Sequence, residues 1–172
     1  MSLEPGARIG DYEVLAVLGA GGMGQVYKVR NVISDRLEAM KVLLPNLIEN
    51  AGLAERFLRE IQAQATMTNP NIATLHTALR AENQLLMVME YVEGHTIDSY
   101  IAQGRLPIQH AIGYTAQVLS ALSYAHKQGV VHRDIKPANM MITPRGDVKL
   151  MDFGIALLAQ ARNLAQGGQN VD

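Results

Sequence analysis

The arrangement of apolar and polar residues in the first half of the chain predicts β-strands. Runs rich in β-branched and aromatic residues, some with strict alternation, end at glycine, proline or polar turns, as half-buried strands do. The expected strands are residues 12–18, 25–30, 37–44, 72–79 and 85–89. Glycine-rich residues 19–24 join the first two strands, which are therefore expected to form a hairpin.

Two segments have helical patterns. Residues 51–67 contain strong helix formers and end before Asn69-Pro70-Asn71, a sequence that breaks a helix. Residues 107–127 carry apolar residues at helical spacing, and Gly129 suits the C-cap that follows. The members of this apolar stripe are Ile108, Ala111, Ile112, Thr115, Val118, Leu119, Leu122 and Ala125.

A sheet with one helix thus precedes a mainly helical segment, which also contains short strands predicted at residues 140–142 and 148–150. We expect an α+β fold with two lobes and a hinge between them. The expected divisions are an N-terminal lobe at residues 11–89, a hinge at 90–94 and a C-terminal lobe that begins within 95–172. Clefts between lobes are common ligand sites.

The composition narrows the class of protein. The chain has 172 residues, of which 48% are hydrophobic and 18% charged, as in an ordinary soluble domain. Its net charge of -1 gives no reason to expect nucleic acid or an anionic membrane as a partner. The absence of cysteine excludes disulfides, thiolate chemistry and cysteine-based zinc sites.

The sequence also carries no targeting signal that we recognise. The first residues lack the basic and apolar regions of a signal peptide, and the longest strongly apolar run, residues 85–89, is far too short to cross a membrane. We therefore expect this segment to be soluble and cytoplasmic, without membrane contact. A membrane anchor in a longer gene product is left open.

The glycine-rich segment fits a phosphate-binding pattern. Residues 19–26 read Gly-Ala-Gly-Gly-Met-Gly-Gln-Val, or G-x-G-x-x-G-x-V. Glycines let backbone N–H groups approach phosphate oxygens because no Cβ intervenes. Alone, the pattern describes a flexible hairpin tip equally well. A dinucleotide-binding loop would lead into a helix, whereas a strand is expected here, and the phosphate loop that ends in Gly-Lys-Ser/Thr is absent.

Two charged residues gain meaning from each other. Lys41 lies near the end of the third expected strand, and Glu60 lies on the helix that follows. Separately, each is most simply a solvated surface charge. Together they suggest an ion pair that would hold the Lys41 ammonium group against a phosphate.

The sharpest signal is residues 132–139, which read His-Arg-Asp-Ile-Lys-Pro-Ala-Asn. They place the carboxylate of Asp134, the cation of Lys136 and the amide of Asn139 on one irregular loop. Phosphoryl transfer needs a carboxylate to orient a hydroxyl, a cation to offset developing charge and oxygen ligands for Mg²⁺. Asp152-Phe153-Gly154 supplies a second metal ligand after a short strand. Each motif alone is weak, but both in this order make a specific signal.

In order and spacing, these residues match the protein kinase signature set, and the sequence resembles the eukaryotic-like serine/threonine protein kinases of bacteria. The resemblance covers residues 11–156. It implies a two-lobed kinase fold with a complete N-terminal β-sheet lobe, one helix within it, and an incomplete helical C-terminal lobe that ends after Asp152-Phe153-Gly154. The form Lys136-Pro137-x-Asn139 is similar to serine/threonine kinases rather than tyrosine kinases.

The resemblance implies a role for each motif residue. Asp134 would be the catalytic carboxylate, and Lys136 would steady the γ-phosphate of ATP. Lys41 would contact the α- and β-phosphates and pair with Glu60. Asn139 and Asp152 would hold Mg²⁺.

The implied nucleotide-binding residues come from both expected lobes. Met89 would be the gatekeeper, and backbone groups of the three residues after it would bind the adenine. The full set is Leu18, Gly19, Ala20, Gly21, Gly22, Met23, Gly24, Val26, Ala39, Lys41, Met89, Glu90, Tyr91, Val92 and Met141. Within this set, Val26, Ala39 and Met141 would enclose the adenine ring.

Two features depart from the family pattern. Gln64 stands where similar kinases carry an apolar residue that stacks towards Phe153, and an amide there either finds a partner or costs about 1–3 kcal/mol. Residues 155–172, expected to be loop or frayed helix, lack the Ala-Pro-Glu motif and contain no Ser, Thr or Tyr. Arg133 normally meets a phosphorylated residue of that segment.

Three readings of function remain. The first is a protein kinase, present here as an incomplete domain, with ATP, Mg²⁺ and a protein serine or threonine as ligands. The second is a non-catalytic fragment that binds ATP or a partner. The third, a small-molecule phosphotransferase of related fold, is disfavoured by Lys136-Pro137 after Asp134. No metal role is expected for His76, His95, His110 and His126, and His132 is expected to pack and hydrogen-bond.

Overall fold

The computed structural model describes residues 3–21, 24–43, 51–81, 84–104 and 106–153. These residues form two compact units. The first contains the described residues up to 61 together with 75–91, and the second contains 62–74 and 92–153. Within the described residues the chain therefore passes between the units three times, and each unit is described by itself.

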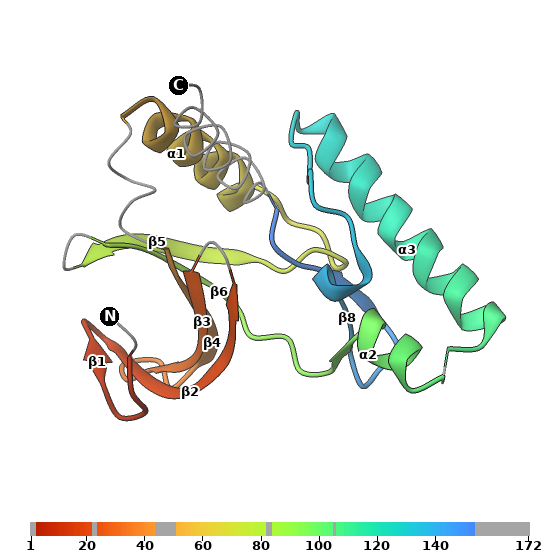
Figure 1. Ribbon diagram of the computed structural model, residues 1–172. Helices are drawn as coiled ribbons and strands as arrows, with labels where there is room; N and C mark the ends of the chain where they lie inside the picture. The colour runs from red at the N-terminus through yellow and green to blue at the C-terminus, as the bar shows by residue number, and fades with distance from the viewer. Residues whose placement is uncertain (1–2, 22–23, 44–50, 82–83, 105, 154–172) are drawn as a thin grey trace, which may run out of the picture. The chain divides into compact units, whose positions relative to one another are not determined.

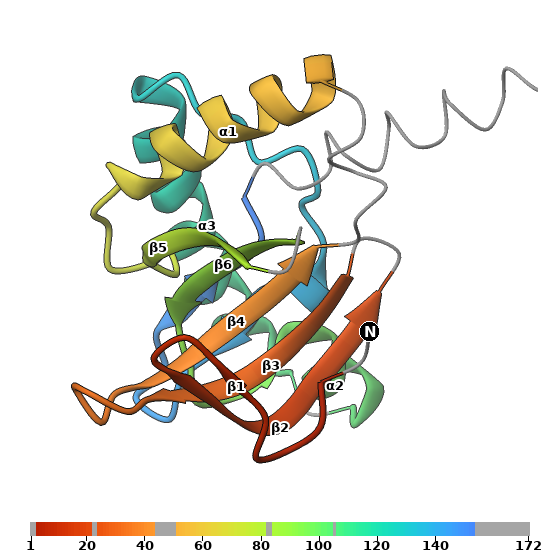
Figure 2. The same cartoon turned by 90° about the vertical axis from the view of Figure 1, so that its left-hand side faces the viewer.

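The first unit contains a six-stranded sheet in the order β1-β2-β3-β4-β6-β5 (Figure 1). Each neighbouring pair is antiparallel, and the sheet is strongly curled in Figure 2. Helix α1, Ala51–Ala65, follows β4 in the chain. The strands are β1 Arg8–Ile9, β2 Tyr12–Gly21, β3 Gly24–Asn31, β4 Leu37–Leu43, β5 Leu75–Ala81 and β6 Gln84–Glu90.

Both faces of the central strands are covered, and this explains why most residues of β4 and β6 are apolar. On one face, Ile61 of α1 joins a core with β4, β5 and β6, whose buried members are Ala39, Leu43, Ile61, Leu75, Leu85, Met87 and Met89. On the other face, Leu3, Ala7 and Ile9 cover a second core, whose buried members are Val14, Tyr27, Val29, Met40, Val42, Leu86 and Val88.

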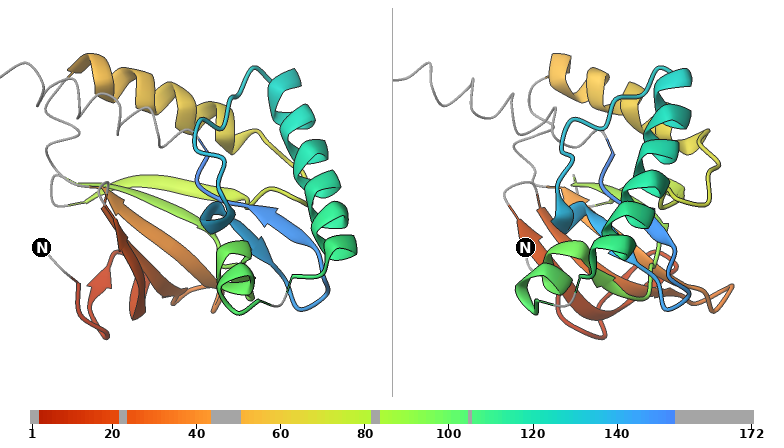
Figure 3. Two further views of the ribbon diagram at one scale, coloured as in Figure 1. Left: turned by 45° about the vertical axis from the view of Figure 1, so that its right-hand side comes forward. Right: turned by 90° about the vertical axis from the view of Figure 1, so that its right-hand side faces the viewer.

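The second unit combines a small antiparallel sheet, in the order β7-β8-β9, with helices (Figure 3). The long helix α3 lies against β9. The elements are β7 His95–Thr96, α2 Ile97–Ala102, α3 Ile108–Lys127, the 3₁₀ helix η2 Pro137–Asn139, β8 Met140–Ile142 and β9 Val148–Leu150. Their shared core contains Met67, Ile72, Ala121, Ala125, Val130, Leu150 and Phe153.

Residues 66–74, after α1, are tied to this second unit by hydrogen bonds. Asn71 Nδ2 donates to Gln117 Oε1 and to the Val148 carbonyl, each at 2.9 Å. Ile72 is 2% exposed and forms an isolated bridge with Leu150. The expectation of a strand from residue 72 is therefore wrong at its start, because Ile72 packs in the second unit and the strand begins at Leu75.

Other boundaries also differ from the sequence expectation. The expected strands at residues 12–18 and 25–30 are longer, since Gly19 and Ala20 still pair with Val26 and Gln25. Helix α1 ends at Ala65 rather than at residue 67. The short elements β1, β7 and α2 were not expected from the sequence at all. Residue 44 and residues 154–172 lie outside the described residues.

Helix α3 is confirmed at Ile108–Lys127, with Gly129 at φ +75° just after the C-cap residue Gln128. Its apolar stripe is only partly buried. Val118, Ala121 and Ala125 are buried, whereas Ile108, Ile112 and Leu119 are exposed by 79%, 65% and 60%. Among the described residues, no helix has the length and apolar character that a membrane span would need.

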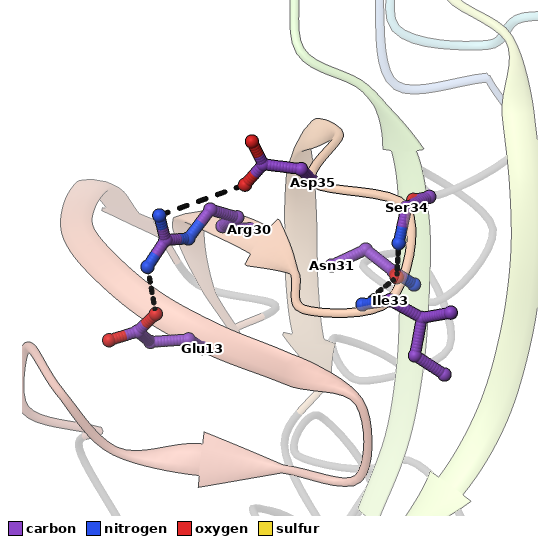
Figure 4. Close-up of polar contacts among 6 residues, drawn as sticks. All are labelled: Glu13, Arg30, Asn31, Ile33, Ser34 and Asp35. Carbon is purple, nitrogen blue, oxygen red and sulfur yellow. Dashed lines mark hydrogen bonds and ion pairs between the residues drawn. The ribbon is translucent and has the colours of Figure 1, made fainter.

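The turn between β3 and β4 is held by local polar contacts (Figure 4). Asn31 Oδ1 accepts hydrogen bonds from the backbone N–H groups of Ile33 and Ser34, each at 3.0 Å. Asp35 adopts φ +56°, a conformation that a short polar residue tolerates. Arg30 lies 2.7 Å from Glu13 on β2 and 3.7 Å from Asp35. These contacts set the entry of the chain into β4, which carries Lys41.

Candidate active site

In the first unit, strand pairing brings several predicted nucleotide-binding residues onto one face of the sheet. Val26 of β3 is the register partner of Lys41 on β4, and Ala39 is the partner of Met89 on β6. Opposed residues of antiparallel strands share a face, and residues two apart on one strand do so too. Val26, Ala39, Lys41 and Met89 therefore line the same face. Lys41 is only 6% exposed. This is unusual, because lysine is seldom buried unless its ammonium group is paired.

The glycine-rich segment forms the ends of β2 and β3, with Gly21 opposite Gly24. Gly24 has φ +148°, and a Cβ atom placed on it would lie 2.0 Å from the Val42 carbonyl oxygen. A glycine is therefore required at this position. Leu18, at an irregularity between β2 and β3, is 46% exposed. Gly22 and Met23 lie outside the described residues, as does the side chain of Glu60.

The predicted hinge begins where β6 ends at Glu90. Tyr91 belongs to the first unit, and Val92 is the first residue of this part of the second. Lys28 of β3 holds its ammonium nitrogen 4.3 Å from the centroid of the Tyr91 ring, which is a cation–π geometry. This contact fixes the position of the Tyr91 ring against the sheet, and sequence reasoning did not find it.

In the second unit, His132 connects the loop at residues 132–139 with the segment that carries Asp152. His132 is 1% exposed, and its Nε2 lies 2.7 Å from the Met151 carbonyl oxygen. The backbone N–H of Asp134 donates to His132 Nδ1, so Nε2 carries the proton and the imidazole is neutral. Its ring also lies 4.5 Å from the ring of Phe153. The packing and hydrogen-bonding role expected for His132 is therefore confirmed.

Burial is the main influence on the pKa of His132 and lowers it from the ordinary value. The hydrogen bond to Met151 and the nearby carboxylates of Asp134 and Asp152 act in the opposite direction but do not outweigh burial. The imidazole thus stays neutral at physiological pH, as its hydrogen bonds require.

Asp134 is the centre of a small polar cluster on this loop. Its Oδ2 lies 2.7 Å from Lys136 Nζ and 2.9 Å from Asn139 Nδ2. The hydrogen bond from Lys136 is the largest influence on the pKa of Asp134 and lowers it, and Asn139 adds to the effect. Asp134 is therefore ionised at neutral pH. A carboxylate with a lowered pKa is a weak proton acceptor and better suited to orienting a hydroxyl group.

The oxygen atoms expected to bind Mg²⁺ occur on neighbouring segments of the second unit. Both side-chain hydrogen bonds of Asn139 use Nδ2, which leaves Oδ1 as the amide atom able to bind a cation. The Met151 N–H donates to the Asn139 carbonyl at 2.8 Å, so Asp152 follows directly after a contact with this residue. Carboxylate and amide oxygens suit Mg²⁺, which commonly takes one or two protein ligands and completes its shell with phosphate oxygens and water.

Among the described residues there is no group of three or more His, Cys, Asp or Glu side chains that could hold a metal ion.

Backbone strain marks the same two motifs. Arg133 has φ +67° and Asp152 has φ +58°, the left-handed conformation that non-glycine residues seldom adopt. Each such residue costs about 1–3 kcal/mol, and such residues cluster at functional sites.

Met141, predicted to contact adenine, lies on β8 and is partly buried.

Gln64 is 6% exposed near the end of α1. Within the described part of the chain, the buried side-chain atom without a hydrogen-bond partner is Glu38 Oε2, and neither amide atom of Gln64 is in that condition. The unmet polar burial that the sequence raised as an alternative for Gln64 is therefore not observed.

Sequence reasoning missed the buried contact between Glu38 and His76, which lie on β4 and β5. A signal was present, since Glu38 is a charged residue in a strand whose residues from 39 onward, apart from Lys41, are apolar.

Comparison with known proteins places these motifs in a family. The sequence matches the protein kinase domain over residues 12–167. The serine/threonine-protein kinase PrkC of Bacillus subtilis is 40% identical over 153 residues, which cover 88% of this chain and 24% of that protein. Serine/threonine-protein kinase PknJ of Mycobacterium tuberculosis is 39% identical over 158 residues, covering 90% of this chain and 27% of that protein.

Solved structures agree with the sequence matches. A crystal structure of the Mycobacterium tuberculosis PknI kinase domain has a TM-score of 0.81 and 33% sequence identity, covering 99% of this chain and 71% of that one. The chain spans about a quarter of the length of the two curated relatives.

Proposed function

Because this chain belongs to the protein kinase domain family, we propose that it takes part in transferring the γ-phosphate of ATP to serine or threonine hydroxyls of a protein substrate. Relatives named as serine/threonine kinases support this reaction. Members of the family generally use ATP and Mg²⁺. The observation that carries the proposal is the cluster of Asp134, Lys136 and Asn139, with contacts of 2.7 and 2.9 Å around one carboxylate oxygen.

In this proposal, each motif residue of the second unit has its own role. Asp134 orients the attacking hydroxyl, and Lys136 offsets negative charge on the transferred phosphoryl group. Asn139 and Asp152 hold Mg²⁺, which when bound neutralises charge on the phosphate oxygens. His132 keeps the loop and the Asp152 segment in one arrangement through the Met151 carbonyl.

The first unit, in the same proposal, supplies the nucleotide-binding surface. The glycine-rich ends of β2 and β3 cover the phosphates, and Lys41 contacts them with the support of Glu60. Val26 and Ala39 contact the adenine on one side, and Met141 on the other. Backbone groups of Glu90, Tyr91 and Val92 bind its edge. The proposed lobes are residues 11–89 and 95–172, with 90–94 as the hinge.

A titration with a labelled ATP analogue and Mg²⁺ tests the proposal on the 172-residue chain. Lys41→Met and Asp152→Ala should each weaken binding, since each removes a group that contacts phosphate or metal. Lys127→Met and Asp147→Ala are matched controls, because Lys127 and Asp147 are exposed residues outside the proposed site. Equal affinity in the wild type and both site variants would refute the assignment.

The second candidate is nucleotide binding without efficient catalysis, and the exposure of Ile108, Ile112 and Leu119 on α3 favours it for the 172-residue chain. Phosphoryl transfer depends on positioning, and a displacement of about 1 Å can cost about 10²-fold in rate. Large exposed apolar side chains on the main helix of the second unit indicate incomplete support. Radiolabelled phosphate incorporation into a basic protein should be much slower for this chain than for one extended through a complete kinase domain. Comparable rates would exclude this candidate.

A further inference from the structure

Glu38 is a fully buried carboxylate in the first unit. Its side chain is 0% exposed, and its Oε1 lies 2.5 Å from His76 Nδ1 and 2.7 Å from an Arg36 guanidinium nitrogen. Its Oε2 is buried and has no hydrogen-bond partner among the described residues. Burying a charge costs free energy even when it is paired, and an apolar residue would avoid that cost. The position of Glu38 in the sheet suggests what its burial accomplishes.

The contact between Glu38 and His76 crosses strand β6. In the sheet, β6 lies between β4, which carries Glu38, and β5, which carries His76. Glu38 is the register partner of Glu90, the last residue of β6. His76 is the extra residue on β5 where the register shifts between the Leu75–Met89 and Thr77–Val88 pairs. A bulge of this kind can re-aim a side chain, here towards Glu38.

The contact is therefore located over one particular end of β6, the end that carries Met89 and Glu90. On the opposite face, Lys28 is the register partner of Ala39 and contacts the Tyr91 ring at 4.3 Å. The point where the chain leaves the sheet is thus held from both faces. The ion pair between Glu13 and Arg30, by contrast, joins side chains that are 24% and 44% exposed.

The local charges also indicate that the Glu38 contacts stabilise the pairing of the strands at this end of β6. Glu38 and Glu90 are directly opposed, and like charges in that position destabilise a sheet. Arg36 and His76 bring positive or hydrogen-bonding groups to the Glu38 carboxylate and offset this effect. The pairing of β4, β6 and β5 at this end therefore depends on the Glu38 contacts.

We propose that Glu38 is a positioning residue for the nucleotide site, which through His76 fixes the end of β6 from which the adenine-binding backbone departs. The inference rests on the proposed function, because the proposed function assigns the adenine contacts to Glu90, Tyr91 and Val92. Binding groups of this kind must be held to within about 0.5 Å of their productive position. A strand end clamped between its two neighbours satisfies that demand.

The test compares Glu38→Gln with Glu13→Gln in the 172-residue chain. Both changes remove one carboxylate charge from the same sheet, but the Glu13 side chain is 24% exposed, whereas that of Glu38 is fully buried. Glu38→Gln should weaken binding of a labelled ATP analogue by about fivefold or more, the range of couplings between linked sites. Amide hydrogen exchange should accelerate in residues 84–92 and not throughout the sheet. Glu13→Gln should leave both quantities unchanged.

A double variant separates positioning from stability. In Glu38→Leu/His76→Leu, apolar side chains replace the buried polar contact, and such replacements often restore stability. Under the proposal, the melting temperature returns to the wild-type value or above, while nucleotide affinity stays reduced and exchange in residues 84–92 stays fast. Affinity that recovers together with stability would overturn the positioning role, as would uniform acceleration of exchange in Glu38→Gln.

The two proposals fail separately. If the wild-type chain does not bind the ATP analogue, the proposed function fails and the exchange pattern alone decides the role of Glu38. If the wild type binds and Glu38→Gln binds equally well, only the role of Glu38 is refuted.

Discussion

Replacing Gly24 with alanine should destabilise the first unit much more than the same change at Gly19, although both glycines belong to one motif. At Gly24 the new Cβ would lie 2.0 Å from the Val42 carbonyl oxygen and 3.0 Å from its carbon, and φ is +148°. At Gly19 no atom lies within 4 Å of the new Cβ. Strand β3 would have to move away from β4 to accept Gly24→Ala.

The magnitude follows from two costs and one gain. Overpacking costs about 1–3 kcal/mol and a strained backbone conformation about 1–3 kcal/mol, while restricting the unfolded chain returns about 0.4–1 kcal/mol, which together make a loss of about 3 kcal/mol. Gly19→Ala restricts the unfolded chain without adding a clash, so it should be neutral or stabilise the protein by about 0.5 kcal/mol.

Thermal unfolding followed by circular dichroism, without nucleotide, measures the difference. A loss of this size should lower the melting temperature of Gly24→Ala by about 6–12 °C, at about 2–4 °C per kcal/mol for a chain of this length. Gly19→Ala should stay within a few degrees of the wild type. Equal effects of the two changes would refute the close approach of Gly24 to Val42 and the reasoning built on it.

Two further predictions concern the loop of the second unit. In a chain extended through a complete kinase domain, Asp134→Asn should lower kcat by about 10²-fold or more, since an orienting carboxylate acts mainly in the transition state, and should leave nucleotide affinity nearly unchanged. Equal turnover would remove Asp134 from that role. Because burial lowers the folded-state pKa of His132, the unfolded chain takes up a proton first as the pH falls below about 6.5. His132 should therefore make the free energy of unfolding, measured with urea, fall by up to about 1.4 kcal/mol per pH unit below that point. The fall with pH should be smaller in His132→Asn than in the exposed control His126→Asn. Equal slopes in the two variants would contradict the neutral, buried imidazole.

The polar cluster around Asp134 in the second unit was predictable from sequence because it is local. Asp134, Lys136 and Asn139 lie on one loop, and their contacts of 2.7 and 2.9 Å need no distant segment to form. Helix α3 was equally clear, since twenty residues with helical spacing and a following glycine define a helix without reference to its neighbours. The partial exposure of α3 was not predictable, because an apolar stripe does not show how much of it packs against other elements.

The positions that sequence misassigned or could not evaluate depend on segments far apart in the chain. Ile72 has the character of a strand residue, yet the backbone of Leu150 pairs with it and draws it into the second unit. Gly19 and Gly24 are equivalent in the motif, and only the approach of Val42 makes one of them irreplaceable. Glu38 is visible in the sequence only as one charged residue of β4, and its contact with His76 forms because β5 lies beside β6 in the sheet. The amino-acid sequence by itself thus determined the chemical groups and the local elements, whereas burial, close approach and charge pairing were decided by tertiary structure, because each depends on which distant backbone becomes the neighbour.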